Sequence, residues 1–403
     1  PLGLFVKPIL PCLGLLEKGN IMIYSKGNTF WKKYCRSFFI ISCVATFHSS
    51  LTMYMGKVFR GELQLDEMAY VVSVYAVCTQ AMLKATIVIL NMEKIRAFIV
   101  QLGRMWRTED LTEVQINKKN ALLKRLKFCY TVFYCMNMIG SWQYMMAPLL
   151  ETVFRKYILQ QECGLLLPFS CSFPFDPTGN WGRYIGVYIF ETYSMFRIVY
   201  FYLGTEFLMI TLCSHLATEF TLLQEDLLNI GPEDKLCYSL RPAPPGIFSV
   251  TCKLSLLIKA LFDYNDFLVI LFVFSLAKEL DDIFNKLIFV NLTTASISIC
   301  FFGFGVKVAR GAVDMANNFV AVLTLILPVF NLCYYGELLR EASAGIADSA
   351  YNNLWYKGDI RYQKLLWFVK YFTSPHWLET LQVSPITARL RRNRPLGRPT
   401  AVQ

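Results

Sequence analysis

Residue types that commonly carry out catalysis are few and scattered in this chain of 403 residues. Its three histidines, His48, His215 and His376, lie far apart, and no HExxH, GxSxG or GxxxxGK[ST] pattern occurs. The 13 cysteines form no CxxC pair, so neither a zinc cluster nor a thioredoxin-like site is predicted. These patterns argue against an enzyme, and we expect no cofactor and no bound metal.

Charged residues such as Lys84, Glu191 and Arg197 stand inside long apolar stretches, where a charge is costly and usually functional. Lys84 lies about 9 Å of helix rise from the end of its stretch, so we expect its ammonium group to reach the membrane surface. Glu191 and Arg197 are six residues apart and do not share a helical face, so we expect each to have a partner elsewhere. Asn291, in the only glycosylation triplet, lies in another such stretch and is expected to be unmodified.

The composition is that of an all-α polytopic membrane helix bundle. Hydrophobic residues make up 55% of the chain, charged residues make up 17%, and the mean hydropathy is +0.40. A membrane-spanning helix needs roughly 20 apolar residues. Six stretches are suitable: 38–55, 68–90, 128–150, 184–213, 284–306 and 317–335. The run 267–277 is apolar but short and flanked by charges, which predicts a buried helix within a loop.

The positions of Lys and Arg predict which side of the membrane each loop faces. Positive residues are retained in the cytoplasm, and 30 of the 40 lie in four regions, against 7 in the remaining loops. Those four regions are the tail 1–37, the loop 91–127, the helical loop 214–283 and the segment after 335. The net charge of +11 is therefore expected to face lipid and not nucleic acid.

We predict that the N-terminus is cytoplasmic, an orientation opposite to that of G-protein-coupled receptors. An epitope inserted before Lys7 should be labelled only in permeabilised cells, because the positive tail is retained inside. Labelling of intact cells would contradict the topology.

Three segments of the sequence resemble insect odorant receptors. The stretch 162–196, which contains LPFSCSFPFDPTGNW, is similar to their second outer loop and fourth helix. The stretch 79–106 is similar to the end of their second helix, and 333–369 to the segment between their helices six and seven. The last match includes an A-x-x-x-Y-x-x-x-W-Y spacing, carried here by Ala347, Tyr351, Trp355 and Tyr356. The resemblance covers most of residues 30–370, and the Thr-Tyr…Gln-Phe ending of gustatory receptors is absent.

This resemblance implies an odorant-binding subunit of a heteromeric ligand-gated cation channel. Such a subunit works in a tetramer with the odorant co-receptor, in the plasma membrane of olfactory neuron dendrites. Helical spacing of Leu216, Phe220, Leu223 and Leu227 predicts that the span 184–213 continues into the cytoplasm. The family suggests that such cytoplasmic helices form the anchor where subunits meet.

The resemblance also implies a pocket between helices two, three, four and six, in their outer half. Volatile ligands have few polar atoms, so their pocket must bind through shape and apolar burial, and flexible Met side chains adapt it to several shapes. Each candidate could instead be an ordinary core or lipid-facing side chain. The candidates are Tyr70, Val74, Met138, Trp142, Met145, Phe190, Tyr193, Phe196, Val320 and Leu323.

The loop 151–183 is predicted to be a lid over this pocket. A loop rich in Pro and Phe can fold back and bury its rings, since each Pro removes a backbone donor that would need a partner. Its candidate lid residues are Phe169, Phe173 and Phe175. Cys163 and Cys171 in the same loop could pair in an oxidising space or remain free thiols, and the sequence leaves both open.

The ends of the chain depart from the family pattern. After the segment 336–369 the family continues into a seventh helix that lines the ion pore, whereas 370–403 has no apolar run near 18 residues. Its five arginines among Pro, Gly and Thr are typical of disorder. We expect an alternative exon or a shifted reading frame, and a chain that does not conduct alone; a basic tail on anionic lipid is the other interpretation. The start at Pro1 suggests that residues precede it.

Two further classes of function remain as alternatives. A metabotropic chemoreceptor would couple to G proteins, and a transporter would show inverted repeats or paired broken helices, which we do not find. A truncated receptor that binds but does not conduct is also compatible with the sequence.

Overall fold

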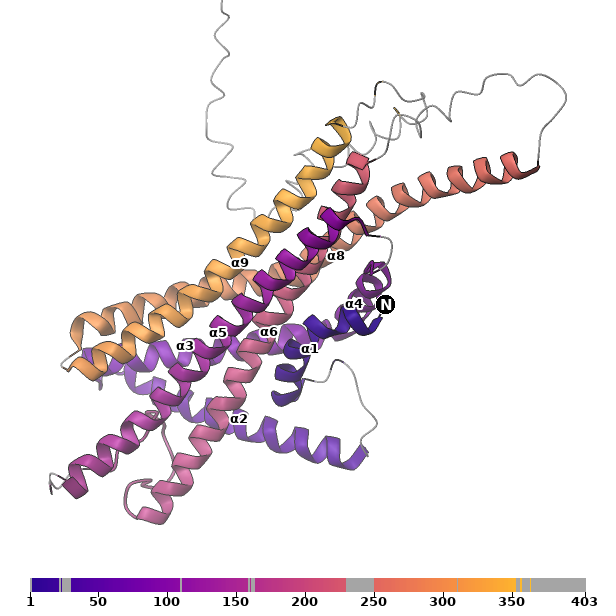
Figure 1. Cartoon of the computed structure of the whole chain (residues 1–403). Helices are drawn as coiled ribbons and strands as arrows, with labels where there is room; N and C mark the ends of the chain where they lie inside the picture. Colours follow the sequence, from indigo (N-terminus) through magenta and orange to yellow (C-terminus); the bar gives the residue numbers. More distant parts are fainter. Residues whose placement is uncertain are drawn as a thin grey trace, which may run out of the picture. The chain divides into compact units, whose positions relative to one another are not determined.

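The computed structural model of the chain describes residues 2–21, 23, 30–108, 111–158, 160, 164–229, 250–309, 311–352, 356 and 363. Within these residues the secondary structure is helical, without strands, which confirms the all-α prediction (Figure 1). The helices are α1 (Leu2–Lys18), α2 (Phe30–Phe59), α3 (Leu65–Leu90), α4 (Met92–Met105), α5 (Glu113–Val153), α6 (Trp181–Asn229), α8 (Val250–Val308) and α9 (Ala312–Asn352). A π-helical turn, η1 (Phe154–Ile158), follows α5.

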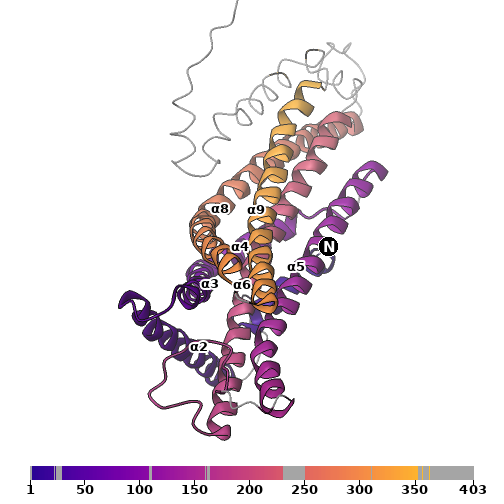
Figure 2. The ribbon, with the colours of Figure 1, turned by 90° about the vertical axis from the view of Figure 1, so that its left-hand side faces the viewer.

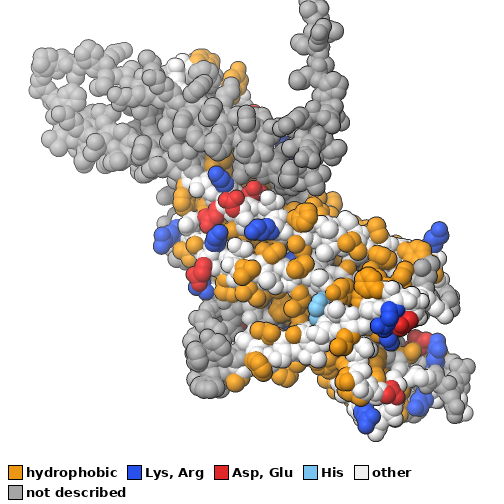
Figure 3. All heavy atoms as spheres, turned by 180° about the vertical axis from the view of Figure 1, so that it is seen from behind, with side chains coloured by type: hydrophobic (Ala, Val, Ile, Leu, Met, Phe, Trp, Pro, Cys, Tyr) orange, Lys and Arg blue, Asp and Glu red, His pale blue; other side chains and the backbone are white. Residues whose placement is uncertain are grey.

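Five helical segments are long and apolar enough to cross a membrane: Cys35–Phe59, Glu67–Leu90, Trp181–Asn229, Phe272–Val308 and Met315–Asn352. Each contains one predicted span, and α5 contains the remaining predicted stretch, 128–150. Large apolar side chains such as Phe38, Leu90 and Phe128 are exposed on these helices. Exposure of this kind is unfavourable in water and suits a lipid environment. Hydrophobic side chains are spread over the face shown in Figure 3, and charged ones gather toward its margins.

Two predictions about helix ends have different outcomes. The predicted helical continuation of the fourth span is confirmed, since α6 runs unbroken to Asn229, and the position of its end in the cytoplasm stays a prediction. The separate helix predicted at 267–277 is wrong, because that run belongs to a single helix, α8, that starts at Val250. No Pro or Gly occurs between 250 and 302, and the charged residues that flank the apolar run are compatible with helix. The flanking charges therefore do not end the helix.

The chain divides into two compact units. Unit 1 comprises Pro1–His215 and Lys286–Leu338, and unit 2 comprises Leu216–Asn285 and Leu339–Gln403, so α6, α8 and α9 contribute to both. In unit 2 the rings of Phe220 and Phe274 are 4.9 Å apart, and the Gln224 side chain donates a hydrogen bond to the Ala342 carbonyl. Unit 1 contains the candidate pocket residues.

Antiparallel packing of α5 and α6 forms the centre of unit 1 (Figures 1 and 2). The Tyr188 hydroxyl donates to the Met145 carbonyl near one end of this helix pair, and Tyr130 hydrogen-bonds Thr211 near the other. Buried apolar side chains of α5, α6 and α9 meet beside the second contact, at Leu126, Ile210 and Tyr335. This pairing sets which residues of the two helices face each other.

The tail 1–37 contains a helix, α1, that packs directly against α6. Gly204 makes this close approach possible, because a Cβ there would lie 2.8 Å from Cδ2 and 3.1 Å from the backbone nitrogen of Leu16. The last turn of α1 is held further by the Arg197 guanidinium, which donates to the Lys18 carbonyl. The residues after 363, including the predicted basic tail, lie outside the described residues.

Candidate ligand pocket

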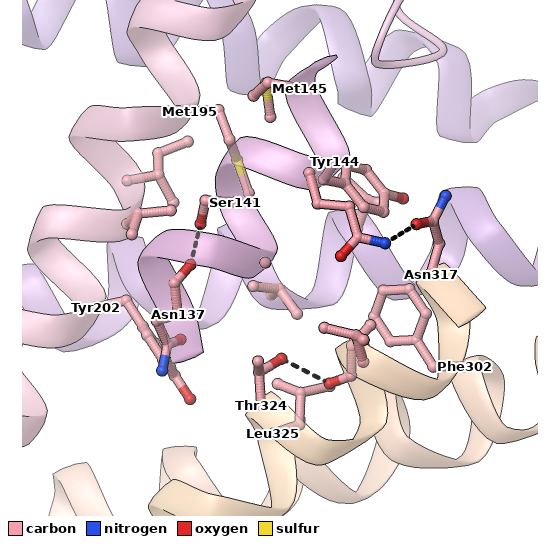
Figure 4. A pocket seen from close by; sticks show the side chains of 18 of the residues that line it. Asn137, Ser141, Tyr144, Met145, Met195, Tyr202, Phe302, Asn317, Thr324 and Leu325 are labelled. Atoms are coloured by element: carbon pink, nitrogen blue, oxygen red, sulfur yellow. Dashed lines mark hydrogen bonds between the residues drawn. The ribbon is translucent and has the colours of Figure 1, made fainter. Parts of the chain in front are cut away.

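Unit 1 contains a partly open cavity of about 120 Å³ between α3, α5, α6, α8 and α9 (Figure 4). Apolar and aromatic side chains predominate in its lining, and a few amide and hydroxyl groups accompany them. The lining residues are Val74, Val77, Asn137, Gly140, Ser141, Gln143, Tyr144, Met145, Phe169, Met195, Ile198, Val199, Tyr202, Phe302, Asn317, Val320, Ala321, Thr324 and Leu325. This composition matches a small-molecule site that binds mainly by shape.

Two hydroxyl groups of the lining have their donors in use. The Ser141 hydroxyl donates to the Asn137 carbonyl over 2.7 Å, and the Thr324 hydroxyl donates to the Ala321 carbonyl over 2.8 Å. Across the cavity wall, Gln143 Nε2 donates to Asn317 Oδ1 over 2.7 Å (Figure 4). Because a hydroxyl oxygen that donates can still accept, these groups suit a ligand that donates a hydrogen bond. Among the described residues, no group of His, Cys, Asp and Glu is arranged to hold a metal ion.

One face of the cavity is closed by Phe169, which comes from the loop between α5 and α6. Its side chain is buried, with its ring 5.4 Å from the ring of Phe47 and 6.0 Å from that of Tyr144. Its backbone N–H donates to Glu191 Oε2 over 3.3 Å. Of the three phenylalanines predicted to form a lid, Phe169 lies in the cavity lining.

Side chains of four helices hold this loop by its backbone. The Tyr70 hydroxyl donates to the Pro168 carbonyl over 2.7 Å, and the Tyr184 hydroxyl donates to the Leu166 carbonyl over 2.8 Å. On the other side, the Ser50 hydroxyl donates to the Ser172 carbonyl over 2.8 Å. Leu166 N–H in turn donates to Thr152 over 3.2 Å. The segment 166–172 is therefore held against the helices through several of its backbone groups.

The other loop residues singled out from the sequence lie differently. Phe173 and Phe175 stack on each other, with centroids 5.8 Å apart, and Phe175 is 46% exposed. Burial raises the pKa of the Cys171 thiol above its ordinary value, so this thiol stays protonated at neutral pH. Cys163 lies outside the described residues, and its pairing with Cys171 stays untested.

Three of the ten candidate pocket residues, Val74, Met145 and Val320, line the cavity. Tyr70 lies next to it, where its ring stacks on Tyr144 with centroids 5.8 Å apart. The remaining six are not in the lining: Met138, Trp142, Phe190, Tyr193, Phe196 and Leu323. Two of these lie on outward faces, since the exposed fraction is 53% for Trp142 and 39% for Leu323.

Helical spacing explains which residues of α5 reach the cavity. The α5 side chains that line the cavity recur at intervals of three and four residues, as in Asn137, Gly140, Ser141 and Met145, whereas Trp142 is turned away. Its ring packs instead on Phe196, 5.0 Å away. Counting back from Met145 in steps of four would have identified Ser141 and Asn137, which a search for aromatic and Met residues missed.

A fully buried polar cluster lies beside the cavity. The Lys84 ammonium group pairs with Glu206 and also donates to Asn291 Oδ1 over 2.9 Å. Gln80 Nε2 donates to the same amide oxygen over 2.6 Å. The ammonium lies 4.6 Å from the ring centroid of Tyr202, a cavity-lining residue. Four helix residues from α3, α6 and α8 thus surround one buried positive charge.

This cluster corrects the prediction for Lys84, whose side chain is 0% exposed and does not reach the membrane surface. A carboxylate on the neighbouring helix provides its charge partner, so the ammonium has no need of water. The prediction for the other two intramembrane charges is confirmed, since each has a partner elsewhere. Glu191 accepts from the Phe169 backbone, and Arg197 donates to the Lys18 carbonyl.

Membrane-length helices around an internal, mostly apolar cavity define a multi-pass helical membrane protein. The chain belongs to the 7tm Odorant receptor family, whose model matches residues 64–374. It is 32% identical to Odorant receptor 85b of Drosophila melanogaster over 94 residues, which is 23% of this chain and 24% of that protein. It is 22% identical to Odorant receptor 13a of the same species over 243 residues, or 59% of this chain and 51% of that protein. The matched segments thus span between about a quarter and a half of these relatives.

Solved structures of insect olfactory receptors share the fold. The olfactory receptor OR5 from Machilis hrabei superimposes with a TM-score of 0.66 over 92% of this chain and 90% of that chain, at 10% sequence identity. The same receptor in complex with eugenol gives a TM-score of 0.67 at 11% identity, with the same coverage. At such low identity the likeness concerns the fold, and it supports the resemblance drawn from the sequence.

Proposed function

We propose that this chain is the odorant-binding subunit of a heteromeric ligand-gated cation channel, assembled with the odorant co-receptor in the dendrites of olfactory neurons. The observation that carries the proposal is the apolar cavity with Phe169 in its wall, inside a chain of the odorant receptor family. In a largely apolar cavity, most of the free energy of ligand binding comes from burying the apolar surface of the ligand.

The ligand class we propose is a small, mostly apolar molecule with one hydrogen-bond donor. Ser141 and Thr324 have free acceptor capacity on their hydroxyl oxygens, as argued above, and the surrounding walls are hydrocarbon. Eugenol, the ligand in the related Machilis hrabei complex, is a molecule of this size class. Its binding to this chain is a natural first measurement.

Binding would open the channel by favouring the conformation that holds the ligand more tightly. The cavity is built from α3, α5, α6, α8 and α9, so a ligand that fits one arrangement of these helices better than another shifts their equilibrium. The family suggests that cytoplasmic helices join the subunits, and in this proposal the end of α6 would be that segment in this chain.

Recordings with ion replacement test the channel assignment. Cells expressing this chain with an insect odorant co-receptor should give an odorant-evoked cation current that persists when G proteins are blocked. A response that disappears under the block would favour a metabotropic receptor. Binding of odorant to the purified chain without any current would indicate a receptor product that does not conduct.

Replacing Met145 by alanine should raise the half-maximal odorant dose by about tenfold, while replacing Met146 should change it by less than about twofold. Met145 lines the cavity and is 1% exposed, whereas its neighbour Met146 is 37% exposed and outside the lining. Lost apolar contact of roughly 1–3 kcal/mol accounts for the shift. Evoked current and ligand-induced thermal stabilisation of the purified chain provide two independent measurements.

The same series separates two positions for the ligand. If Trp142→Ala shifts the dose more than Met145→Ala, the ligand occupies the surface around Trp142 and Phe196 and not the cavity. Equal effects of Met145→Ala and Met146→Ala would contradict the assignment of the cavity.

A further inference from the structure

A second hollow in unit 1 lies between α1, α5 and α6, and it shares no lining residue with the ligand pocket. Its volume is about 760 Å³. The lining residues are Pro11, Gly14, Leu15 and Lys18 from α1, Leu123, Leu126, Lys127, Tyr130, Thr131 and Tyr134 from α5, and Phe207 from α6. Its walls are therefore mainly hydrocarbon and aromatic. We call this hollow the α1–α5 groove.

Packing explains why the α1–α5 groove is open. Leu16 packs α1 against α6 at Gly204, whereas the face of α1 that lines the groove includes a glycine, Gly14. A Cβ added at Gly14 would have no heavy atom within 4 Å. Glycine costs about 1 kcal/mol in a helix interior relative to alanine. No close neighbour of Gly14 requires a glycine, so its absence of a side chain leaves space in the groove.

The charges on the groove have one sign. Lys18 and Lys127 both belong to the lining and are exposed, and no Asp or Glu is among the described residues of that lining. The Lys18 ammonium lies 5.6 Å from the Tyr200 ring centroid, beside the end of α1 that Arg197 binds. An apolar channel with two ammonium groups at its edges is complementary to a molecule with a hydrocarbon chain and a negative head.

We propose that the α1–α5 groove is a binding site for an anionic membrane phospholipid. One acyl chain would lie along Leu15, Leu123 and Phe207, and the headgroup phosphate would meet Lys127, while Lys18 adds positive potential at the other end of the groove. Both lysines belong to stretches that the distribution of positive charge assigns to the cytoplasm. The cytoplasmic leaflet is the one that carries anionic lipid, and basic pockets between helices on that side bind such headgroups. This site does not depend on the proposed odorant function.

The test uses the full chain purified in detergent, with bound lipid counted by native mass spectrometry. Phosphatidylserine and phosphatidylcholine with identical acyl chains are offered in equal amounts. The wild-type chain should retain phosphatidylserine in preference to phosphatidylcholine by about fivefold to tenfold, the selectivity expected from one lysine at an anionic headgroup with a second positive charge further away. The double variant Lys18→Gln/Lys127→Gln should lose this preference.

Two further variants separate the site from general charge and from misfolding. Lys94→Gln/Lys124→Gln removes the same charge from exposed lysines outside the lining and should keep the preference. Gly14→Leu fills the groove without changing charge, favours helix, and should abolish retention of the bound phosphatidylserine. Circular dichroism and gel filtration establish that each variant is folded.

Three outcomes would overturn the proposal. Equal retention of the two lipids by the wild-type chain would mean that the groove does not select an anionic headgroup. A preference that survives both Lys18→Gln/Lys127→Gln and Gly14→Leu would place the lipid elsewhere on the surface. Retention of neither lipid would mean that the groove takes a different occupant, such as a helix of another protein.

Discussion

Replacing Glu206 with leucine should destabilise the chain by about 3–5 kcal/mol, because Lys84 would remain as a buried charge without its partner. Both side chains are completely buried, and α3, α6 and α8 all contribute to the cluster around them. An unpaired ammonium at this depth has access to neither water nor lipid headgroups. We expect the midpoint of thermal unfolding in detergent to fall by about 5–15 °C.

The double variant Lys84→Met/Glu206→Leu should regain most of that stability, since removal of both charges leaves apolar side chains of similar volume. Recovery would show that the pair matters through its charges and not through the shape of Glu206. An exposed pair of the same kind provides the control: Arg155 and Glu151 are both close to half exposed, so Glu151→Leu should cost at most about 1 kcal/mol. Equal losses at Glu206 and Glu151 would contradict this account.

The partner of Lys84 also shows what the sequence could not reveal. Glu206 lies inside a stretch whose mean hydropathy is that of an ordinary membrane span, so the carboxylate does not stand out. It is also 122 residues away from Lys84 in the sequence. Pairing between distant helices depends on how they pack and turn. A single sequence records which residues reach the membrane, but it does not record which of them meet.

The positions of the helices were predictable for a simple physical reason. The thickness of the membrane requires about 20 apolar residues per span, and a run of that length is visible in a sequence. Which face of each helix points inward was much harder to predict, because a helix that is apolar all round has no amphipathic pattern to mark its buried side. Val74, Met145 and Val320 line the cavity, whereas Trp142 and Leu323 lie on exposed faces of the same helices.

The loop after α5 could be interpreted from composition because its prolines and phenylalanines rarely suit an ordinary hydrated loop. The prediction did not distinguish among its three phenylalanines, and burial does: Phe169 lies in the cavity wall, while Phe175 is exposed. The difference follows from the backbone contacts of Tyr70, Ser50 and Glu191, which fix the segment around Phe169. Only the first of those three contacts involves a residue named from the sequence as a pocket candidate.

Replacing Phe169 with alanine should accelerate the release of bound odorant by about tenfold or more, since related binding sites differ mostly in their dissociation rates. The ring closes one side of the cavity and packs on Phe47 and Tyr144, so its removal opens a path out of the cavity. The association rate should change less. The decay of evoked current after odorant is washed out measures release, and displacement of ligand from the purified chain measures it without requiring conduction.

Truncating a buried phenylalanine also costs about 3–5 kcal/mol of stability, so an effect of Phe169→Ala on folding has to be separated from an effect on the lid. Phe169→Leu keeps an apolar plug in the cavity wall and should release odorant nearly as slowly as the wild-type chain. Phe175→Ala removes the same side chain from an exposed position of the same loop and should leave release unchanged. If Phe175→Ala accelerates release as much as Phe169→Ala does, mobility of the whole loop controls exit, and the closing role belongs to no single ring. If none of the three variants alters release, the ligand leaves by another route, and the loop has a structural function in holding α2, α3 and α6 together.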